Sequence, residues 1–206
     1  MITQVYFVRH AQSDSSVREG RIRPLTDEGL RDSKAVTWVL QDKGIDFMIS
    51  SPYKRSMDTI TDLAQTLGME IHTDEDFRER NAGGWHSGNN GEFFEFIRRQ
   101  WADFDYSFAD GECLRSVQER NIRALERVLR EHEGERIVIG THGTALSTIL
   151  NYYYPQYDYD CFMKIVDLMP FVIRVDLDDG KAVGSQIELI IHKVYKHKHK
   201  QDSMPV

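Results

Sequence analysis

Short apolar runs alternate with amphipathic helical segments through about residue 150, and this alternation limits the possible folds more than any other feature of the chain. The run at residues 2–8 is typical of a strand buried between two layers of helices. Consecutive parallel strands need crossover connections, which helices supply. The pattern therefore predicts an α/β fold: a three-layer sandwich with a mostly parallel central sheet and helices on both faces.

Capping and turn residues mark the ends of the expected elements. We expect Thr26 to cap a helix that ends before Gly44, and Ser51 with Pro52 to open another. Residues 178–180, Asp-Asp-Gly, are typical of a hairpin turn, which adds an antiparallel strand at the edge of the sheet. The predicted strands are 2–8, 47–50, 69–72, 137–140, 171–177 and 185–191, and the predicted helices are 27–43, 52–67, 92–104, 112–132 and 144–153.

The chain length suits one domain, which we place at residues 1–192. An aromatic segment at about 85–111 interrupts the alternation, and we expect it to form a small inserted helical lid. Residues 193–206 contain four lysines and one aspartate, which predicts a basic, disordered tail. Cys113 and Cys161 lie in unrelated contexts, which excludes a disulfide framework and fits a reducing compartment.

The charge and hydropathy of the chain exclude several classes of partner. The net charge is −7, and the body is more acidic than this because the tail is positive. An acidic body disfavours nucleic acid as the main partner. The chain has no apolar run long enough to span a membrane and no secretory leader pattern at its start. We therefore expect a cytoplasmic protein with neither a nucleic-acid nor a membrane partner.

Polar residues follow three of the predicted strands at the points where the strands end. Arg9 and His10 follow the first strand, residues 51–55 the second, and residues 141–143 the fourth. Ligands of such sheets bind beyond the carboxyl ends of the strands, so these groups should converge. Guanidinium groups suit phosphate oxygens, and a histidine can accept a phosphoryl group. Arg55 also lies near a helix start, where free amides favour an anion.

The same residues resemble the histidine phosphatase superfamily, the phosphoglycerate-mutase-like family. Each motif is modest alone, but their common order along the chain is specific to that family. The similar segments are VRHAQS (8–13), PLTDEGL (24–30), SSPYKRSMDT (50–59), RERNAGGW (78–85), DGECLRSVQER (110–120) and GTHGTAL (140–146).

The resemblance implies a phosphoryl transfer that needs neither a metal nor a cofactor. His10 would attack phosphorus and form a phosphohistidine, while Arg9, Arg55 and a protonated His142 would hold the three equatorial oxygens. Glu79 would protonate the leaving alkoxide and then activate the hydrolytic water.

The resemblance places further residues around the substrate. Ser16, Gly143 and Thr144 would lie near the phosphate, and a glycine beside His142 suits the close approach of an anion. We also expect Arg21 or Arg80 to recognise a second anionic group, and Arg23 is a third candidate for that contact.

Several functions stay open on the sequence alone. The favoured one is a phosphomonoester hydrolase acting on a small phosphorylated metabolite. A phosphoglycerate-type mutase is the alternative, but a mutase needs a strongly cationic closed pocket, whereas residues 104–110 are acidic and aromatic. A non-catalytic binding or regulatory module on the same fold is the third. A homodimer formed through the terminal strands is also open.

Overall fold

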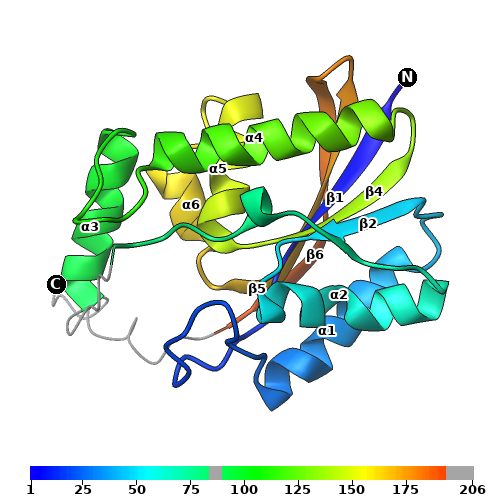
Figure 1. Ribbon diagram of the computed structural model, residues 1–206, viewed down its shortest axis with the longest axis horizontal. Helices are drawn as coiled ribbons and strands as arrows, with labels where there is room; N and C mark the ends of the chain where they lie inside the picture. The colour runs from blue at the N-terminus through cyan, green and yellow to red at the C-terminus, as the bar shows by residue number, and fades with distance from the viewer. Residues whose placement is uncertain (84–89, 194–206) are drawn as a thin grey trace, which may run out of the picture.

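The computed structural model describes residues 1–83 and 90–193, and within them a mixed sheet lies between two layers of helices (Figure 1). The strands are β1 (Thr3–Arg9), β2 (Phe47–Ser50), β3 (His72–Thr73), β4 (Arg136–Thr141), β5 (Leu168–Asp178) and β6 (Lys181–His192). They form one six-stranded sheet in the order β3-β2-β4-β1-β5-β6. The first four are mutually parallel, whereas β5 runs antiparallel to both β1 and β6. The predicted α/β architecture is thus confirmed.

The helices cover both faces of this sheet. They are α1 (Asp27–Leu40), α2 (Lys54–Leu67), α3 (Asn90–Ala102), α4 (Leu114–Glu131), α5 (Gly143–Tyr153) and α6 (Tyr159–Ile165). Alternate residues of β1 point to opposite faces: Val5 and Phe7 join the core under α4 and α5, while Tyr6 and Val8 join the core against α1 and α2. The apolar run of β1 is therefore buried on both sides.

Helix α2 begins later than the sequence predicts. Its N-cap is Tyr53, so the prediction that Ser51 caps the helix and Pro52 opens it is wrong. Ser51 Oγ instead accepts the backbone N–H of Tyr53 in a turn that leads out of β2. The structure also contains α6, which the sequence did not predict, and the third strand is limited to His72–Thr73.

The segment that we expect to form a lid is anchored through α3. Helix α3 packs against α6 through Phe96, Ile97 and Phe162, three buried side chains of one apolar cluster. Gln100, on the last turn of α3, is fully buried and its amide donates to the backbone oxygens of Tyr106 and Glu112. Residues 84–89 of the expected lid lie outside the described residues.

Lys193, the first residue of the expected tail, belongs to the folded part of the chain. Lys193 is buried, and its Nζ donates to Glu28 Oε1 at 2.7 Å and to Asp32. Burial alone would lower the pKa of Lys193, but these two carboxylates outweigh it and the pKa is raised. Residues 194–206 lie outside the described part of the chain. None of the described helices has the length and apolar character needed to cross a bilayer.

Candidate active site

The polar groups that follow β1, β2 and β4 meet at one edge of the sheet. β1 and β4 are parallel neighbours with Arg9 opposite Thr141, so the residues that follow each strand are adjacent in space. His10 and His142 consequently face each other with ring centroids 5.3 Å apart. Both are buried, and so is Arg55 at the start of α2. The predicted convergence at the carboxyl ends of the strands is confirmed.

His10 is held in the form that a nucleophile requires. Its Nδ1 lies 2.7 Å from the backbone oxygen of Ala11, and because a carbonyl can only accept, Nδ1 carries the ring proton. Nε2 therefore keeps its lone pair. Burial, followed by the charges of Arg55 and Arg9, holds the pKa of His10 well below 6.5. The imidazole is accordingly neutral at physiological pH.

The segment 24–30 supports the loop that follows His10. The Thr26 backbone N–H donates to the Gln12 oxygen at 3.0 Å, and the Thr26 hydroxyl binds the Gln12 side chain. A Cβ on Gly29 would lie 2.1 Å from that same Gln12 oxygen, so only glycine fits there. On the other side, Thr59 Oγ1 accepts the N–H of Ala11. The loop is thereby fixed by α1 and α2.

Arg9 is oriented by α6, the helix that sequence reasoning missed. Its guanidinium donates to the backbone oxygens of Ile165 and Val166 at the end of that helix. Gly143 lies against the other side of the group, and a Cβ there would come within 3.1 Å of Arg9 Nη2. The structure thus shows Gly143 giving room to Arg9.

Arg55 supplies a second buried cation. Its Nη1 donates to the Gly20 oxygen at 2.6 Å, and its guanidinium lies 5.1 Å from the Tyr53 ring centroid. Burial, partly offset by Glu79, lowers the pKa of Arg55 to about 10. It therefore stays charged at neutral pH.

His142 is fully buried and neutral in the phosphate-free protein. Its Nε2 lies 2.8 Å from Ser51 Oγ, and its Nδ1 has no hydrogen-bond partner among the described residues. Burial, then Arg55 and His10, hold its pKa well below 6.5. The protonated His142 implied by the resemblance is therefore not the resting form.

The Glu79 carboxylate lies against the first turn of α5. Its Oε2 accepts the N–H of Thr144 at 3.1 Å, and its Oε1 accepts those of Ala145 and Arg80. The Thr144 amide, expected on the phosphate, is thus bonded to Glu79. Oε1 therefore accepts two hydrogen bonds and Oε2 accepts one, which leaves one lone pair of Oε2 outside this set of bonds.

Arg120 positions the loop that carries Glu79, a role that sequence reasoning did not assign. Its side chain is 4% exposed and donates to the backbone oxygens of Asp76, Arg78 and Glu79. It also binds Glu112 at 2.8 Å. Burial raises the pKa of Glu112, but the hydrogen bond from Arg120 and the other donors lower it by more, so the net shift is downward. The segment 110–120 contains both partners and could have signalled this pair.

The two arginines expected to bind a second anion have other partners. Arg21 forms a two-point ion pair with Glu75 at 2.9 Å on the surface. Arg80 donates to Gln100 and lies 5.0 Å from the Phe96 ring centroid, and burial lowers its pKa. The structure does not bring either guanidinium into the cluster of buried site residues.

Ser16 and Arg23 lie on the loop beside this cluster. Ser16 is exposed, and its N–H donates to Asp14 Oδ1 in a local turn. The Arg23 side chain donates to the Val17 oxygen, and its charge contributes to the lowered pKa values of His10 and Arg55. Of the three candidate arginines, Arg23 is the one whose charge acts on His10.

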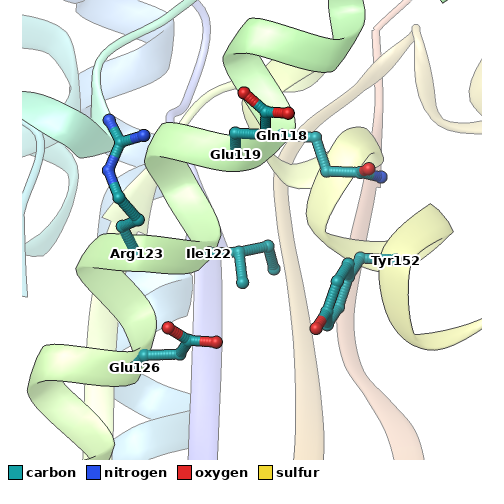
Figure 2. A pocket seen from close by; sticks show the side chains of 6 residues that line it. All are labelled: Gln118, Glu119, Ile122, Arg123, Glu126 and Tyr152. Carbon is teal, nitrogen blue, oxygen red and sulfur yellow. The ribbon is translucent and has the colours of Figure 1, made fainter.

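A separate hollow of about 260 Å³ lies on the outer surface of α4 and α5 (Figure 2). Its lining residues are Gln118, Glu119, Ile122, Arg123, Glu126 and Tyr152. None of them belongs to the site, so we assign the chemistry to the histidine cluster. Among the described residues, no group of three or more histidine, cysteine or carboxylate side chains is placed to hold a metal.

Comparison with known families and proteins gives a consistent match. The family model described as "Histidine phosphatase superfamily (branch 1)" matches residues 5–178. A bifunctional protein of Mycobacterium tuberculosis is 28% identical over 157 residues, which cover 72% of this chain and 43% of that protein. The probable phosphoglycerate mutase GpmB of Shigella dysenteriae is 31% identical over 158 residues, covering 72% and 73%. The chain thus spans less than half the length of the first curated relatives.

Solved structures share the fold. A mycobacterial glucosyl-3-phosphoglycerate phosphatase superposes with a TM-score of 0.73 at 16% identity, covering 92% of this chain and 98% of the other. YhfR of Bacillus stearothermophilus gives a TM-score of 0.72 at 23% identity, covering 87% and 94%. A phosphoglycerate mutase of Bacillus anthracis gives 0.69 at 14%, covering 91% and 92%.

Proposed function

Because this chain belongs to branch 1 of the histidine phosphatase superfamily, we propose that it hydrolyses a small phosphomonoester through a phosphohistidine on His10. One observation carries the proposal. The imidazole of His10 is buried, neutral and protonated on Nδ1, and it faces His142 with Arg9 and Arg55 beside it. This arrangement supplies a lone pair on Nε2 close to cations and donors that suit a phosphate.

The steps follow from these positions. His10 Nε2 attacks phosphorus in line, forming a P–N bond as the ester P–O bond breaks. Arg9, Arg55 and His142 bind the equatorial oxygens, where charge is spread in the transition state. Glu79 gives its proton to the leaving alkoxide. It then takes a proton from the water that attacks phosphorus, and the P–N bond breaks to release inorganic phosphate and restore His10.

The surrounding charges favour a hydrolase over a mutase. A mutase must retain and reorient a phosphorylated intermediate while it excludes water, which calls for several cations around the substrate. Arg21 is paired with Glu75, and Arg80 contacts Gln100 and Phe96. Fewer cations are left to hold such an intermediate. The buried, oriented nucleophile likewise favours an enzyme over a non-catalytic binding module.

The test is hydrolysis of p-nitrophenyl phosphate in EDTA by the wild type, His10→Ala and Glu79→Gln, together with a panel of sugar, nucleotide and glycerate phosphates. We expect turnover in the wild type, none in His10→Ala, and a kcat reduced by about 100-fold or more in Glu79→Gln, because general acid catalysis is lost. Wild type quenched during turnover in alkaline denaturant should carry phosphate on His10, because a P–N bond survives base but is lost in acid. Transfer between 2- and 3-phosphoglycerate with no release of phosphate would favour the mutase. Silence in both assays would favour the binding module.

A further inference from the structure

Ser51 and His142 form a buried hydrogen-bonded pair beside the nucleophile, and the phosphoryl-transfer steps give Ser51 no role. Both residues are 0% exposed, and Ser51 Oγ lies 2.8 Å from His142 Nε2. The same oxygen accepts the backbone N–H of Tyr53 at 3.2 Å. The Tyr53 ring then closes over His142, with centroids 5.2 Å apart. The hydroxyl is thus fixed in place and shielded from water.

The hydroxyl proton of Ser51 determines which nitrogen of His142 is protonated. Within the described part of the chain, His142 Nε2 is the acceptor that lies within hydrogen-bond distance of this hydroxyl. When the hydroxyl donates to Nε2, that nitrogen keeps its lone pair and the ring proton lies on Nδ1. In the reverse arrangement, Ser51 Oγ would accept from both Tyr53 and His142, and its own proton would have no acceptor among the described residues.

The opposite nitrogen of His142 points to the same assignment. Nδ1 is buried and has no hydrogen-bond partner in the described structure, and an unsatisfied polar atom is expensive to bury. The His10 ring is 5.3 Å from that of His142, so a phosphoryl group on His10 brings an oxygen within reach. A lone pair on Nδ1 would repel that oxygen, whereas an N–H would donate to it.

We propose that Ser51 is a positioning residue, whose hydroxyl holds His142 as the Nδ1–H tautomer so that an uncharged ring donates to the phosphoryl oxygen. The identity of that ligand rests on the proposed function, whereas the tautomer itself does not. The environment agrees, because burial with Arg55 and His10 disfavours a charged His142. Phosphate binding would then require no proton uptake by His142.

Long-range ¹H–¹⁵N NMR spectra of the imidazoles test this directly. In the substrate-free wild type at pH 7.5, we expect His142 to show a protonated Nδ1 and an unprotonated Nε2. In Ser51→Ala, the signal should move toward the Nε2–H form. The same variant should lower kcat by about 10- to 100-fold with a smaller change in KM, because a donor to the transition-state oxygens is lost. Ser51→Thr, which keeps the hydroxyl, should restore both.

Ser56→Ala is the matched control, because Ser56 on α2 is buried as Ser51 is but bonds to Ser50. In this variant, the tautomer of His142 and the values of kcat and KM should match those of the wild type. A wild-type His142 protonated on Nε2 would overturn the proposal even if Ser51→Ala cannot be folded. An unchanged tautomer and kcat in Ser51→Ala would overturn it as well. A wild type with the Nδ1–H form that hydrolyses no phosphoester would refute the proposed function and leave the tautomer assignment standing.

Discussion

The site combines charged arginines with uncharged histidines. Arg55 keeps its charge despite burial, because its pKa falls only to about 10. Burial first, and then the positive field of Arg55 and Arg9, lowers the pKa values of His10 and His142 and makes their protonation unfavourable. A protonated His10 could not attack phosphorus. In the proposed mechanism, the arginines would attract an anionic substrate and would also help to keep His10 unprotonated.

The lowered pKa values of the two histidines predict that the free energy of unfolding decreases at acidic pH. Both histidines have lowered pKa values in the folded state, so below pH 6.5 the unfolded chain binds protons that the folded chain excludes. Their contribution is present above pH 6.5 and is lost as the pH decreases, by at most about 1.4 kcal/mol per pH unit for each histidine. Urea unfolding between pH 5 and 6.5 should show this slope. It should be shallower in His142→Asn, and an unchanged slope would contradict the expectation.

At the scale of elements, the loop after β3 depends on one buried arginine. Arg120 extends from α4 and donates to the backbone oxygens of Asp76, Arg78 and Glu79, while Glu112 neutralises its charge. Glu79, the proposed general acid, is therefore placed by α4 as well as by the start of α5. A loop of this kind would otherwise sample many conformations, and each would misplace the Glu79 carboxylate.

We expect Arg120→Ala to reduce both stability and catalysis. It leaves Glu112 with fewer partners in a half-buried position, which should lower the free energy of unfolding by about 3 kcal/mol. Without Arg120, the Glu79 carboxylate is no longer held in place. The kcat of the variant should therefore be lower than that of the wild type even when it is measured well below the unfolding temperature, where the variant is folded. Arg115→Ala is the control, because Arg115 also lies on α4 but forms an exposed ion pair with Asp105. Its removal should change the free energy of unfolding and kcat little. Equal effects of the two variants would be inconsistent with this role.

At the scale of the molecule, the site joins elements from distant parts of the chain. A residue or a contact comes from each of β1, α2, the loop carrying Glu79, β4 with α5, and α6. The helices among these elements come from both layers (Figure 1). A bound phosphate analogue therefore bridges elements that would separate on unfolding. β6 forms the outer edge of the sheet, and the homodimer through the terminal strands stays a prediction.

Orthovanadate should consequently raise the unfolding temperature. A ligand that binds only the folded protein stabilises it by about 2.7 kcal/mol at 100 times its Kd. The shift should disappear in Arg55→Gln. It should persist in Arg21→Ala, because Arg21 pairs with Glu75 rather than with the site residues. Loss of the shift in Arg21→Ala would instead support the sequence-based expectation that Arg21 contacts the substrate. Differential scanning fluorimetry over a range of vanadate concentrations provides the measurement.

The order of motifs along the chain was enough to determine the family, the parallel sheet and the placement of Arg9, His10, Arg55 and His142, because strand ends in such a sheet must converge. Contacts between distant segments were decided by the tertiary structure alone. Four contacts depend on this packing: Arg9 bonds to the end of α6, Arg80 to Gln100 of α3, Lys193 to Glu28, and Ser51 to His142. Local sequence patterns report backbone preference and periodicity, whereas the partner of a buried polar group depends on which elements meet in space.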